Sequence, residues 1–265
     1  MEIPVQRFDD KVVLVTGGSR GIGRGIATAF LDGGARVYAC ARNAPAEPVT
    51  GATAGSGSAA FLKVDVRDDD QVKVLIETLV EREGRLDVVV NNAGGSPAVD
   101  AATVSPRFTE AIMRLNLLAP LLVSQRAYPH LKASRGAIVN IASVSGIRAS
   151  PGTMAYGAAK AGLLSATTSL AQEWGPEVRV NAIVAGLIKT AADAADEHYG
   201  GRAGIEAIES RLPARRMGTA EDIAAACLYL ASDSAAYVSG AALEVFGGGE
   251  PPSFLSFVED AAGVS

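Results

Sequence analysis

The sequence predicts a single α/β domain in which parallel strands alternate with helices. Its length of 265 residues suits one large domain. Residues 11–41 predict a strand, a glycine-rich turn, a helix and a second strand, which together form a βαβ unit. Further short apolar runs alternate with helical stretches up to residue 246, with no internal repeat and no second domain. These observations favour a doubly wound sheet whose ligand site lies where the strands end.

The opening βαβ unit carries the first candidate site. Residues 11–16 (KVVLVT) form a β-branched run typical of a buried parallel strand, and a helix follows directly after the turn. Gly17, Gly21 and Gly23 would let a ligand approach the backbone, and the first N–H groups of the helix favour a pyrophosphate. The alternative is a turn without a ligand. The second strand at residues 35–41 favours nucleotide binding.

The same turn also matches G-x-S-x-G, the nucleophile elbow of serine hydrolases, with Ser19 as the nucleophile. A hydrolase also needs a base, and only His130 and His198 could provide one. Neither histidine lies in a stretch that would orient an imidazole. Hydrolysis is therefore kept as a minor alternative.

The remaining elements follow at short intervals. Strands are predicted at residues 61–64, 86–90, 137–142, 178–184 and 241–246, and helices at residues 68–83, 106–130, 154–174 and 220–232. Residues 43–59 are rich in Pro, Gly, Ala, Ser and Thr and predict a mobile surface loop. Residues 187–217 form a long polar segment near the end of a strand. This segment is either a substrate loop or lid, or a solvated insertion.

Composition argues against several classes of function. With 24 Lys and Arg against 29 Asp and Glu, the chain has a formal charge of −5, which disfavours nucleic acid as a partner. No apolar run approaches the ~20 residues of a membrane helix, and residues 1–10 lack the apolar core of a signal peptide. Cys40 and Cys227 are the only cysteines, which supports neither a disulfide framework nor a zinc site. We therefore expect a cytoplasmic protein with no membrane contact and no metal.

A phenol and an ammonium group are predicted to lie one turn apart in the helix 154–174. Tyr156 and Lys160 are four residues apart and share a helix face. A neighbouring positive charge lowers the pKa of a phenol from its usual value of ~10, so the pair could act as a general acid and base. Ser143 ends the preceding strand, 13 residues before Tyr156. Because Tyr and Lys also pair on ordinary solvated helices, proton transfer depends on support from other motifs.

Two further polar stretches are expected near this site. Residues 91–95 (NNAGG) follow a buried strand, and the carboxyl ends of strands in a doubly wound sheet converge on the binding crevice. Asn116 lies in the middle of the predicted helix 106–130, between leucines. Taken alone, these features would be a plain Asn-Gly turn and a solvated asparagine.

Taken together, the motifs resemble those of the short-chain dehydrogenase/reductase family, with similarity to its 3-oxoacyl reductases, over residues 9–249. The matching positions in chain order are residues 16–23, Asp65, residues 91–94, Asn116, Ser143, Tyr156, Lys160 and Asn181. Each motif is weak alone, whereas the full set in order is specific. The resemblance implies a doubly wound Rossmann domain with a parallel seven-stranded sheet and helices on both faces.

The resemblance also implies catalytic roles for four residues. Tyr156 would protonate the substrate oxygen, or deprotonate the alcohol in reverse, and Lys160 would lower the pKa of Tyr156 while binding the nicotinamide ribose. Ser143 would hold the carbonyl oxygen, and Asn116 would anchor a water that relays protons to Lys160. The spacing of Tyr156 and Lys160 resembles that of carbonyl reductases, because enoyl reductases have a longer gap. The implied activity is hydride transfer between a nicotinamide cofactor and a carbonyl or secondary alcohol.

The end of the second strand bears on the choice of cofactor. Relatives that use NAD resemble one another in carrying an acid there, which accepts hydrogen bonds from the adenosine ribose. This chain has Ala41 followed by Arg42, and Arg42 with Arg20 could clamp the 2′-phosphate of NADP. NADP(H) is therefore favoured over NAD(H).

The resemblance assigns further cofactor contacts along the chain. Asp65 and Val66 would flank the adenine, residues 92–94 the ribose, and Ile188 and Thr190 the carboxamide. The complete expected set is Gly17, Ser19, Arg20, Gly21, Ile22, Gly23, Arg42, Asp65, Val66, Asn92, Ala93, Gly94, Tyr156, Lys160, Gly186, Ile188 and Thr190.

The chain departs from the family pattern in three places. The usual Pro-Gly after the sixth strand is Ala185-Gly186, the usual Asp-Gly-Gly near the end is Phe246-Gly247-Gly248, and a loop replaces the helix that would brace the adenosine side. None of these departures touches the four catalytic candidates. The alternatives are an NAD-dependent alcohol dehydrogenase of the same family and a non-catalytic NADP(H)-binding sensor. The expected partners are a small carbonyl or alcohol and further copies of the chain, in a tetramer or dimer, while no motif identifies the substrate.

Overall fold

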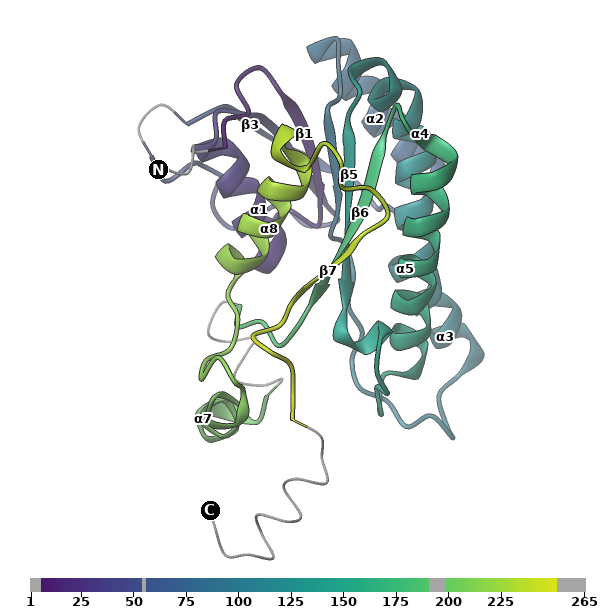
Figure 1. The fold of residues 1–265 in the computed structure, drawn as a ribbon. Helices are drawn as coiled ribbons and strands as arrows, with labels where there is room; N and C mark the ends of the chain where they lie inside the picture. The colour runs from purple at the N-terminus through teal and green to yellow at the C-terminus, as the bar shows by residue number, and fades with distance from the viewer. Residues whose placement is uncertain (1–5, 54–55, 191–198, 252–265) are drawn as a thin grey trace, which may run out of the picture.

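A computed structural model of the chain describes residues 6–53, 56–190 and 199–251 (Figure 1). One seven-stranded sheet organises these residues, with the strands in the order β3-β2-β1-β4-β5-β6-β7, and every neighbouring pair is parallel. The strands are β1 (Val12–Thr16), β2 (Arg36–Ala41), β3 (Ala59–Lys63), β4 (Val88–Asn91), β5 (Ala137–Ser143), β6 (Arg179–Ala185) and β7 (Ala242–Val245). The predicted doubly wound α/β fold is confirmed.

Helices cover both faces of the sheet (Figure 1). They are α1 (Gly21–Asp32), α2 (Asp69–Glu83), α3 (Pro106–Met113), α4 (Ala119–Ser134), α5 (Met154–Trp174), α7 (Gly201–Arg211) and α8 (Ala220–Ala231), with short helical turns η1 (Arg114–Leu118), η2 (Val144–Gly146) and η3 (Asp233–Ala235). One buried apolar core lies between the sheet and α1 with α8, and a second lies between the sheet and α2, α4 and α5. Successive side chains of β1 point to opposite faces of the sheet, so this one strand contributes to both cores. Val13 and Val15 belong to the first core, and Val12 and Leu14 to the second.

The predicted helix 106–130 is interrupted in the structure. It consists of α3, the π-helical turn η1 and α4, which extends to Ser134. The side chain of Asn116 donates to the carbonyl oxygen of Ile112 at 3.0 Å, in the place of a backbone N–H. Pro120, one turn later, has no N–H to donate back along the helix. These two residues give the physical reason for the wider turn.

Two segments predicted as irregular are more ordered than expected. Residues 42–53 and 56–58 contain no helix, yet they are fastened to α1, because Arg24 donates to the carbonyls of Glu47 and Pro48. In the segment 187–217 the structure contains α7, which the sequence pattern did not predict. The part of this segment at residues 191–198 lies outside the described residues.

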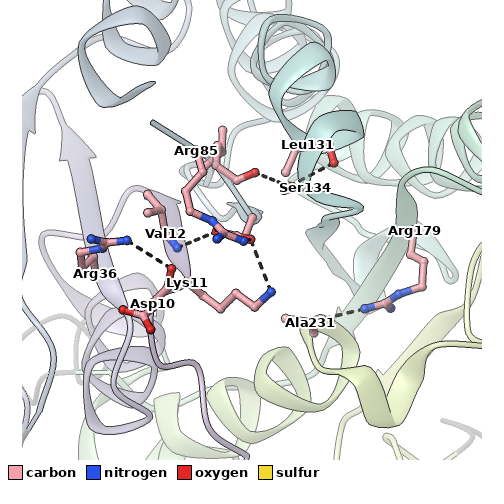
Figure 2. Close-up of polar contacts among 11 residues, drawn as sticks. Asp10, Lys11, Val12, Arg36, Arg85, Leu131, Ser134, Arg179 and Ala231 are labelled. Atoms are coloured by element: carbon pink, nitrogen blue, oxygen red, sulfur yellow. Dashed lines mark hydrogen bonds and ion pairs between the residues drawn. The ribbon is translucent and has the colours of Figure 1, made fainter. Parts of the chain in front are cut away.

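The amino-terminal edge of the sheet is fastened by buried polar contacts. Asp87 is only 3% exposed and accepts hydrogen bonds from the backbone of Val12 at 2.9 Å and from Nε of Arg85 at 2.8 Å. Figure 2 shows Lys11, Val12 and Arg85 directed toward one another, and Nζ of Lys11 lies 3.5 Å from the Asp87 carboxylate. This edge is therefore structural, and the candidate site residues gather at the opposite, carboxyl-terminal edge.

Candidate functional site

The turn between β1 and α1 needs its glycines because other parts of the chain lie close against its backbone. Gly17 and Gly21 have φ angles of 67° and 53°, which L side chains rarely adopt. A Cβ on Gly23 would lie 2.3 Å from the carbonyl oxygen of Gly17 and 2.4 Å from Nδ2 of Asn92. A Cβ on Gly21 would lie 3.4 Å from the Thr190 side chain. The turn thus brings together residues that were predicted to contact opposite parts of one cofactor.

The amino-terminal end of α1 fits a bound anion. Arg20 at its N-cap makes no side-chain cap, and the first turn contains no acidic residue. By contrast, Asp68 caps α2, and Thr219 with Asp222 forms a capping box on α8. The first N–H groups of α1 therefore lack the side-chain acceptors that those two helices have. A pyrophosphate bound there would supply such acceptors.

The turn after β4 is joined to the glycine turn. Oγ1 of Thr16 accepts hydrogen bonds from the backbone N–H groups of Asn92 and Ala93, both at 3.0 Å. The Asn92 side chain donates to the carbonyl oxygen of Thr16 at 2.9 Å. Two strand ends that are far apart in sequence therefore form one rigid wall of the site.

Asn116 is fully buried, unlike a solvated mid-helix asparagine. Its Oδ1 accepts from the N–H of Gly95 at 2.8 Å, and its Nδ2 donates to the Gly95 carbonyl at 3.0 Å. A Cβ on Gly94 would lie 2.7 Å from this Oδ1 and 3.3 Å from Nζ of Lys160. Asn116 thus holds the turn after β4 against the first part of α5.

The phenol, hydroxyl and ammonium groups predicted to act together do lie together. Tyr156 forms a side-chain hydrogen bond with Ser143 at the end of β5. Nζ of Lys160 lies 5.6 Å from the centre of the Tyr156 ring and donates to the carbonyl oxygen of Ile141 at 2.7 Å. The helix α5 has the predicted bounds, and it carries both residues to the carboxyl ends of β4 and β5.

Burial changes the proton affinities of both groups on α5. Lys160 is only 3% exposed, and burial lowers the pKa of its ammonium group to about 8. Burial raises the pKa of Tyr156 above its ordinary value, and the hydrogen bond with Ser143 opposes this rise. The predicted lowering of the Tyr156 pKa by Lys160 is therefore not found: burial and Ser143 are the causes of its shift. Tyr156 is a neutral phenol at pH 7.

The side of the site where the adenosine was predicted to bind contains exposed arginines and a paired acid. Arg20 and Arg42 are exposed, and within the described residues neither forms an ion pair. Asp65 is bound by Arg67, with Nε at 2.9 Å from Oδ1, and this hydrogen bond lowers the pKa of Asp65. Val66 is buried beside them. The Asp65 carboxylate is thus already engaged, which the sequence pattern did not indicate.

The segment after β6 forms the side of the site where the nicotinamide was predicted to bind. Ile188 is buried and pairs with Gly218, and its neighbour Lys189 donates to the Gly218 carbonyl at 2.8 Å. A Cβ on Gly186 would lie 2.6 Å from Cβ of Phe246. Gly186, which directly follows the departure at Ala185, therefore lies against Phe246, the departure near the end of the chain.

The sequence pattern missed three side chains near the site. The phenol of Tyr199 forms a hydrogen bond with the backbone of Ile188. Arg148 follows η2 and binds the carboxylate of Glu250, with Nε at 2.9 Å from Oε2. No local motif marks these residues, since three distant segments supply them.

The described residues do not form a hydrolase site. Ser19 lies in the turn at the carboxyl edge of the sheet, while His130 lies near the end of α4. That end of α4 is at the opposite edge, where Ser134 donates to the Leu86 carbonyl at 2.6 Å. His198 lies outside the described residues. Within the described part of the chain, no helix has the length and apolar character needed to cross a bilayer.

Comparison with known proteins agrees with this geometry. Residues 17–249 match a family model described as enoyl-(acyl carrier protein) reductase. The chain is 35% identical over 246 residues to 3-oxoacyl-(acyl-carrier-protein) reductase FabG of Thermotoga maritima, covering 91% of this chain and 98% of FabG. It is 38% identical over 260 residues to L-fucose dehydrogenase of Oryctolagus cuniculus, covering 92% of this chain and 86% of the relative.

A solved structure has a fold similar to that of this chain. The ligand-free aldohexose dehydrogenase of Thermoplasma acidophilum superposes with a TM-score of 0.84 at 32% identity, covering 91% of this chain and 94% of that protein. The family match covers most of the chain, and the relatives reduce carbonyl groups or oxidise alcohols by name. The protein is therefore an oxidoreductase of carbonyl or alcohol groups and belongs to the short-chain dehydrogenase/reductase family.

Proposed function

We propose that the protein is an NADP(H)-dependent reductase of ketones or aldehydes that can also oxidise the corresponding alcohols. The observation that carries this proposal is the contact of Tyr156 with Ser143, beside the buried Lys160 and across from the glycine turn. When bound, the reduced nicotinamide supplies hydride to the carbonyl carbon. The chain supplies the proton and the hydrogen bonds.

Tyr156 is the proposed general acid. Its raised pKa keeps the phenol protonated, so that it can donate to the carbonyl oxygen, and such a donor accounts for about 10²- to 10⁴-fold in rate. The Ser143 hydroxyl donates a second hydrogen bond to the same oxygen. Lys160 binds the nicotinamide ribose and returns a proton toward Tyr156. Asn116 holds the backbone of residues 94–95 against Lys160.

The exposed guanidinium groups support NADP(H) over NAD(H). An acid at the end of β2 would repel a 2′-phosphate, and this chain has Ala41 there. Arg42 and Arg20 form no ion pair among the described residues, although the charge of Arg42 acts on the nearby Asp65, so both guanidinium groups can bind the phosphate. The buried, unpaired thiols of Cys40 and Cys227 support a reducing compartment such as the cytoplasm.

The names of the relatives suggest two kinds of substrate, an acyl group on a carrier protein and a sugar. We also propose that the chain forms a homo-oligomer, a dimer or tetramer, through the helices around Tyr156. Leu118 on η1 is 52% exposed and Met154 on α5 is 54% exposed, and a second copy would cover such apolar side chains. Light scattering on the purified protein tests the oligomeric state.

Cofactor titration tests the proposal first. Heat release is followed on adding NADPH or NADH to the wild type and to Arg42→Ala. We expect tighter binding of NADPH, and we expect Arg42→Ala to erase most of that preference. Tighter binding of NADH would instead favour an NAD-dependent alcohol dehydrogenase. Binding of neither would remove the basis for the nucleotide site.

Tyr156→Phe separates an enzyme from a sensor. We expect this variant to bind NADPH as the wild type does and to lose about 10²-fold or more of its activity in a screen of carbonyl substrates. Tyr237→Phe is the matched control, because Tyr237 is fully exposed. If no carbonyl compound is turned over although NADPH binds, a non-catalytic sensor becomes the better explanation.

A further inference from the structure

An ion pair connects the loop after β5 to the segment after β7. Arg148 follows η2, and its guanidinium binds both carboxylate oxygens of Glu250, through Nε at 2.9 Å from Oε2 and through a second contact from Nη2. The two residues are 102 positions apart in the sequence. Two parallel hydrogen bonds fix the relative orientation of a guanidinium and a carboxylate as well as their distance. The pair therefore sets the position of Arg148 relative to the end of β7.

The backbone of Arg148 closes the turn η2. Its N–H donates to the carbonyl oxygen of Val144 at 3.1 Å, and the N–H of Ile147 donates to the same oxygen at 3.1 Å. At the start of this turn, Oγ of Ser143 accepts a hydrogen bond from the N–H of Ser145 at 3.2 Å. The hydroxyl that is proposed to hold the substrate oxygen is thus bound to the same short turn that Arg148 closes.

The turn η2 also lies directly against α5. A Cβ on Gly146 would lie 2.9 Å from the carbonyl carbon of Lys160, and a Cβ on Gly157 would lie 2.8 Å from the carbonyl oxygen of Ser145. These two contacts bring η2 against the part of α5 that carries the proposed proton donor. A small displacement of η2 would therefore change the distance between the Ser143 hydroxyl and the side chains of α5.

The other partner, Glu250, extends from a turn that is fastened on two sides. Within this turn the N–H of Gly249 donates to the carbonyl oxygen of Phe246 at 3.1 Å. The N–H of Ala214 donates to the carbonyl oxygen of Gly247 at 3.1 Å, which joins the turn to the end of the segment 187–217. The carboxylate of Glu250 is therefore a well-anchored point to which the loop after β5 is attached.

The pair is better suited to positioning than to stabilising the fold. The side chains of Arg148 and Glu250 are 43% and 33% exposed, and ion pairs in contact with water contribute modestly to the free energy of unfolding. A hydroxyl that binds a substrate oxygen must be held within about 0.5 Å of its productive position. A modest force is sufficient to bias a loop by such a distance.

We propose that Glu250, acting through Arg148, positions the Ser143 hydroxyl for its hydrogen bond to the substrate oxygen. This inference rests on the proposed function and adds two residues to its catalytic loop. Both residues act through η2 and are positioning residues. Because the hydrogen bond from Ser143 strengthens as charge develops on the substrate oxygen, its misplacement slows the reduction step and leaves the binding of NADPH unchanged.

Single substitutions measure the contribution of the pair. The measured quantity is the single-turnover rate of NADPH oxidation at saturating NADPH, with the carbonyl compound that the wild type reduces fastest. We expect Glu250→Gln and Arg148→Gln each to lower this rate about tenfold. The double variant should lose no more than the slower single variant, because the same pair is broken in each case. Heat titration should give the NADPH affinity of the wild type.

A matched ion pair provides the control. Arg126 on α4 binds both carboxylate oxygens of Asp69 on α2, at 2.8 Å and 2.6 Å, and these side chains are 42% and 52% exposed. Asp69→Asn breaks a pair of the same geometry that also joins two separate segments. We expect this variant to keep the wild-type rate.

A second background distinguishes positioning from a general loss of structure. Glu250→Gln is combined with Ser143→Ala, a substitution that should slow reduction by about 10²- to 10³-fold and still leave it measurable in a single turnover. We expect Glu250→Gln to cost less than about twofold in this background, because the hydroxyl that Glu250 positions is absent. Thermal unfolding checks that every variant is folded at the temperature of the assay.

The outcomes separate this inference from the proposed function. A tenfold loss in both backgrounds would show that Glu250 acts through a group other than Ser143. An unchanged rate in Glu250→Gln, additive losses in the double variant, or a loss explained by weaker NADPH binding would also overturn the positioning role. Each of these results leaves the proposed function standing, because the wild type still reduces its substrate. A lack of any NADP(H)-dependent turnover by the wild type overturns both.

Discussion

At the scale of single residues, Lys160 shows a conflict between stability and function. Within the described part of the chain its buried ammonium group makes one hydrogen bond, to the carbonyl oxygen of Ile141, and burial lowers its pKa to about 8. A buried charge without a carboxylate partner costs folding free energy. The proposed ribose-binding role explains why such a costly group is present.

Lys160→Met is therefore expected to inactivate the protein while making it more stable at pH 7. A fall of the pKa from 10.5 to about 8 corresponds to about 3 kcal/mol of lost stability, against about 1 kcal/mol for the hydrogen bond to Ile141. Below about pH 8 the wild type carries the full cost. Between about pH 8 and 10.5 its unfolded state binds more protons than its folded state, so wild-type stability rises and the advantage of the variant shrinks.

Urea unfolding of both proteins at pH 7 and at pH 10 measures this difference. A variant that is less stable than the wild type at pH 7 would show that the Lys160 ammonium group is better solvated or paired than its burial indicates. Lys73→Met provides the control for loss of one positive charge, since the Lys73 side chain is 55% exposed.

The pKa of Lys160 and the direction of the Tyr156 pKa shift predict the pH profile of carbonyl reduction. The phenol of Tyr156 stays protonated well above neutral pH because burial raises its pKa. The first group to lose a proton on raising the pH is therefore Lys160, near pH 8. We expect kcat/KM for reduction with NADPH to be level near neutral pH and to fall above about pH 8. A rate that increases with pH over this range would mean that reduction requires the deprotonated form of one of these groups.

At the scale of elements, the sequence predicts well those helices, strands and turns that depend on the local residue pattern. The glycine turn, the strands and the bounds of α5 follow from short apolar runs, clustered glycines and helical spacing, and the structure confirms them. The π-helical turn at Asn116 was not predicted, because it depends on a side chain that replaces a backbone donor. The partners of Tyr199 and Glu250 were missed because they come from segments far apart in sequence.

The loop after β2 shows how a segment without a helix is held in place. Oδ1 of Asp32, at the end of α1, accepts hydrogen bonds from the backbone of Ala52 at 2.7 Å and of Thr53 at 3.0 Å, and from Oγ of Ser56 at 2.8 Å. Arg24 donates to the carbonyl of Pro48 from the same helix. The loop that begins at Arg42 is thus fastened along α1, which takes over the bracing expected from a helix.

Asp32→Ala is expected to release this loop. Loss of the shared acceptor should lower the free energy of unfolding by about 1–3 kcal/mol, because several donors lose one partner. Affinity for NADPH should also fall, since Arg42 would be less well positioned. Urea unfolding and heat titration measure the two effects, with the exposed Glu81→Ala as control. An unchanged affinity in a destabilised variant would indicate that the loop does not position Arg42.

At the scale of the whole molecule, the two edges of the sheet have different tasks. The amino-terminal edge carries Asp87 with its donors and Arg179, which donates to the Ala231 carbonyl at the end of α8 at 3.2 Å (Figure 2). The carboxyl-terminal edge carries the glycine turn, Asn116 and Tyr156. Because parallel strands place all their carboxyl ends on one side, rigidity at one edge supports an accessible site at the other.

Asp87→Ala is therefore expected to weaken the fold without changing the site. The substitution leaves the buried N–H of Val12 without its acceptor, and we expect a loss of about 2–4 kcal/mol in unfolding free energy. Asp87→Asn should lose less, since its amide oxygen can still accept from Val12. For the folded fraction of both variants, the affinity for NADPH should match the wild type. Urea unfolding measures the stability of both variants, and heat titration at a temperature where both are folded measures their affinity for NADPH. A large loss of NADPH affinity in folded Asp87→Asn would show that the two edges are coupled through the sheet.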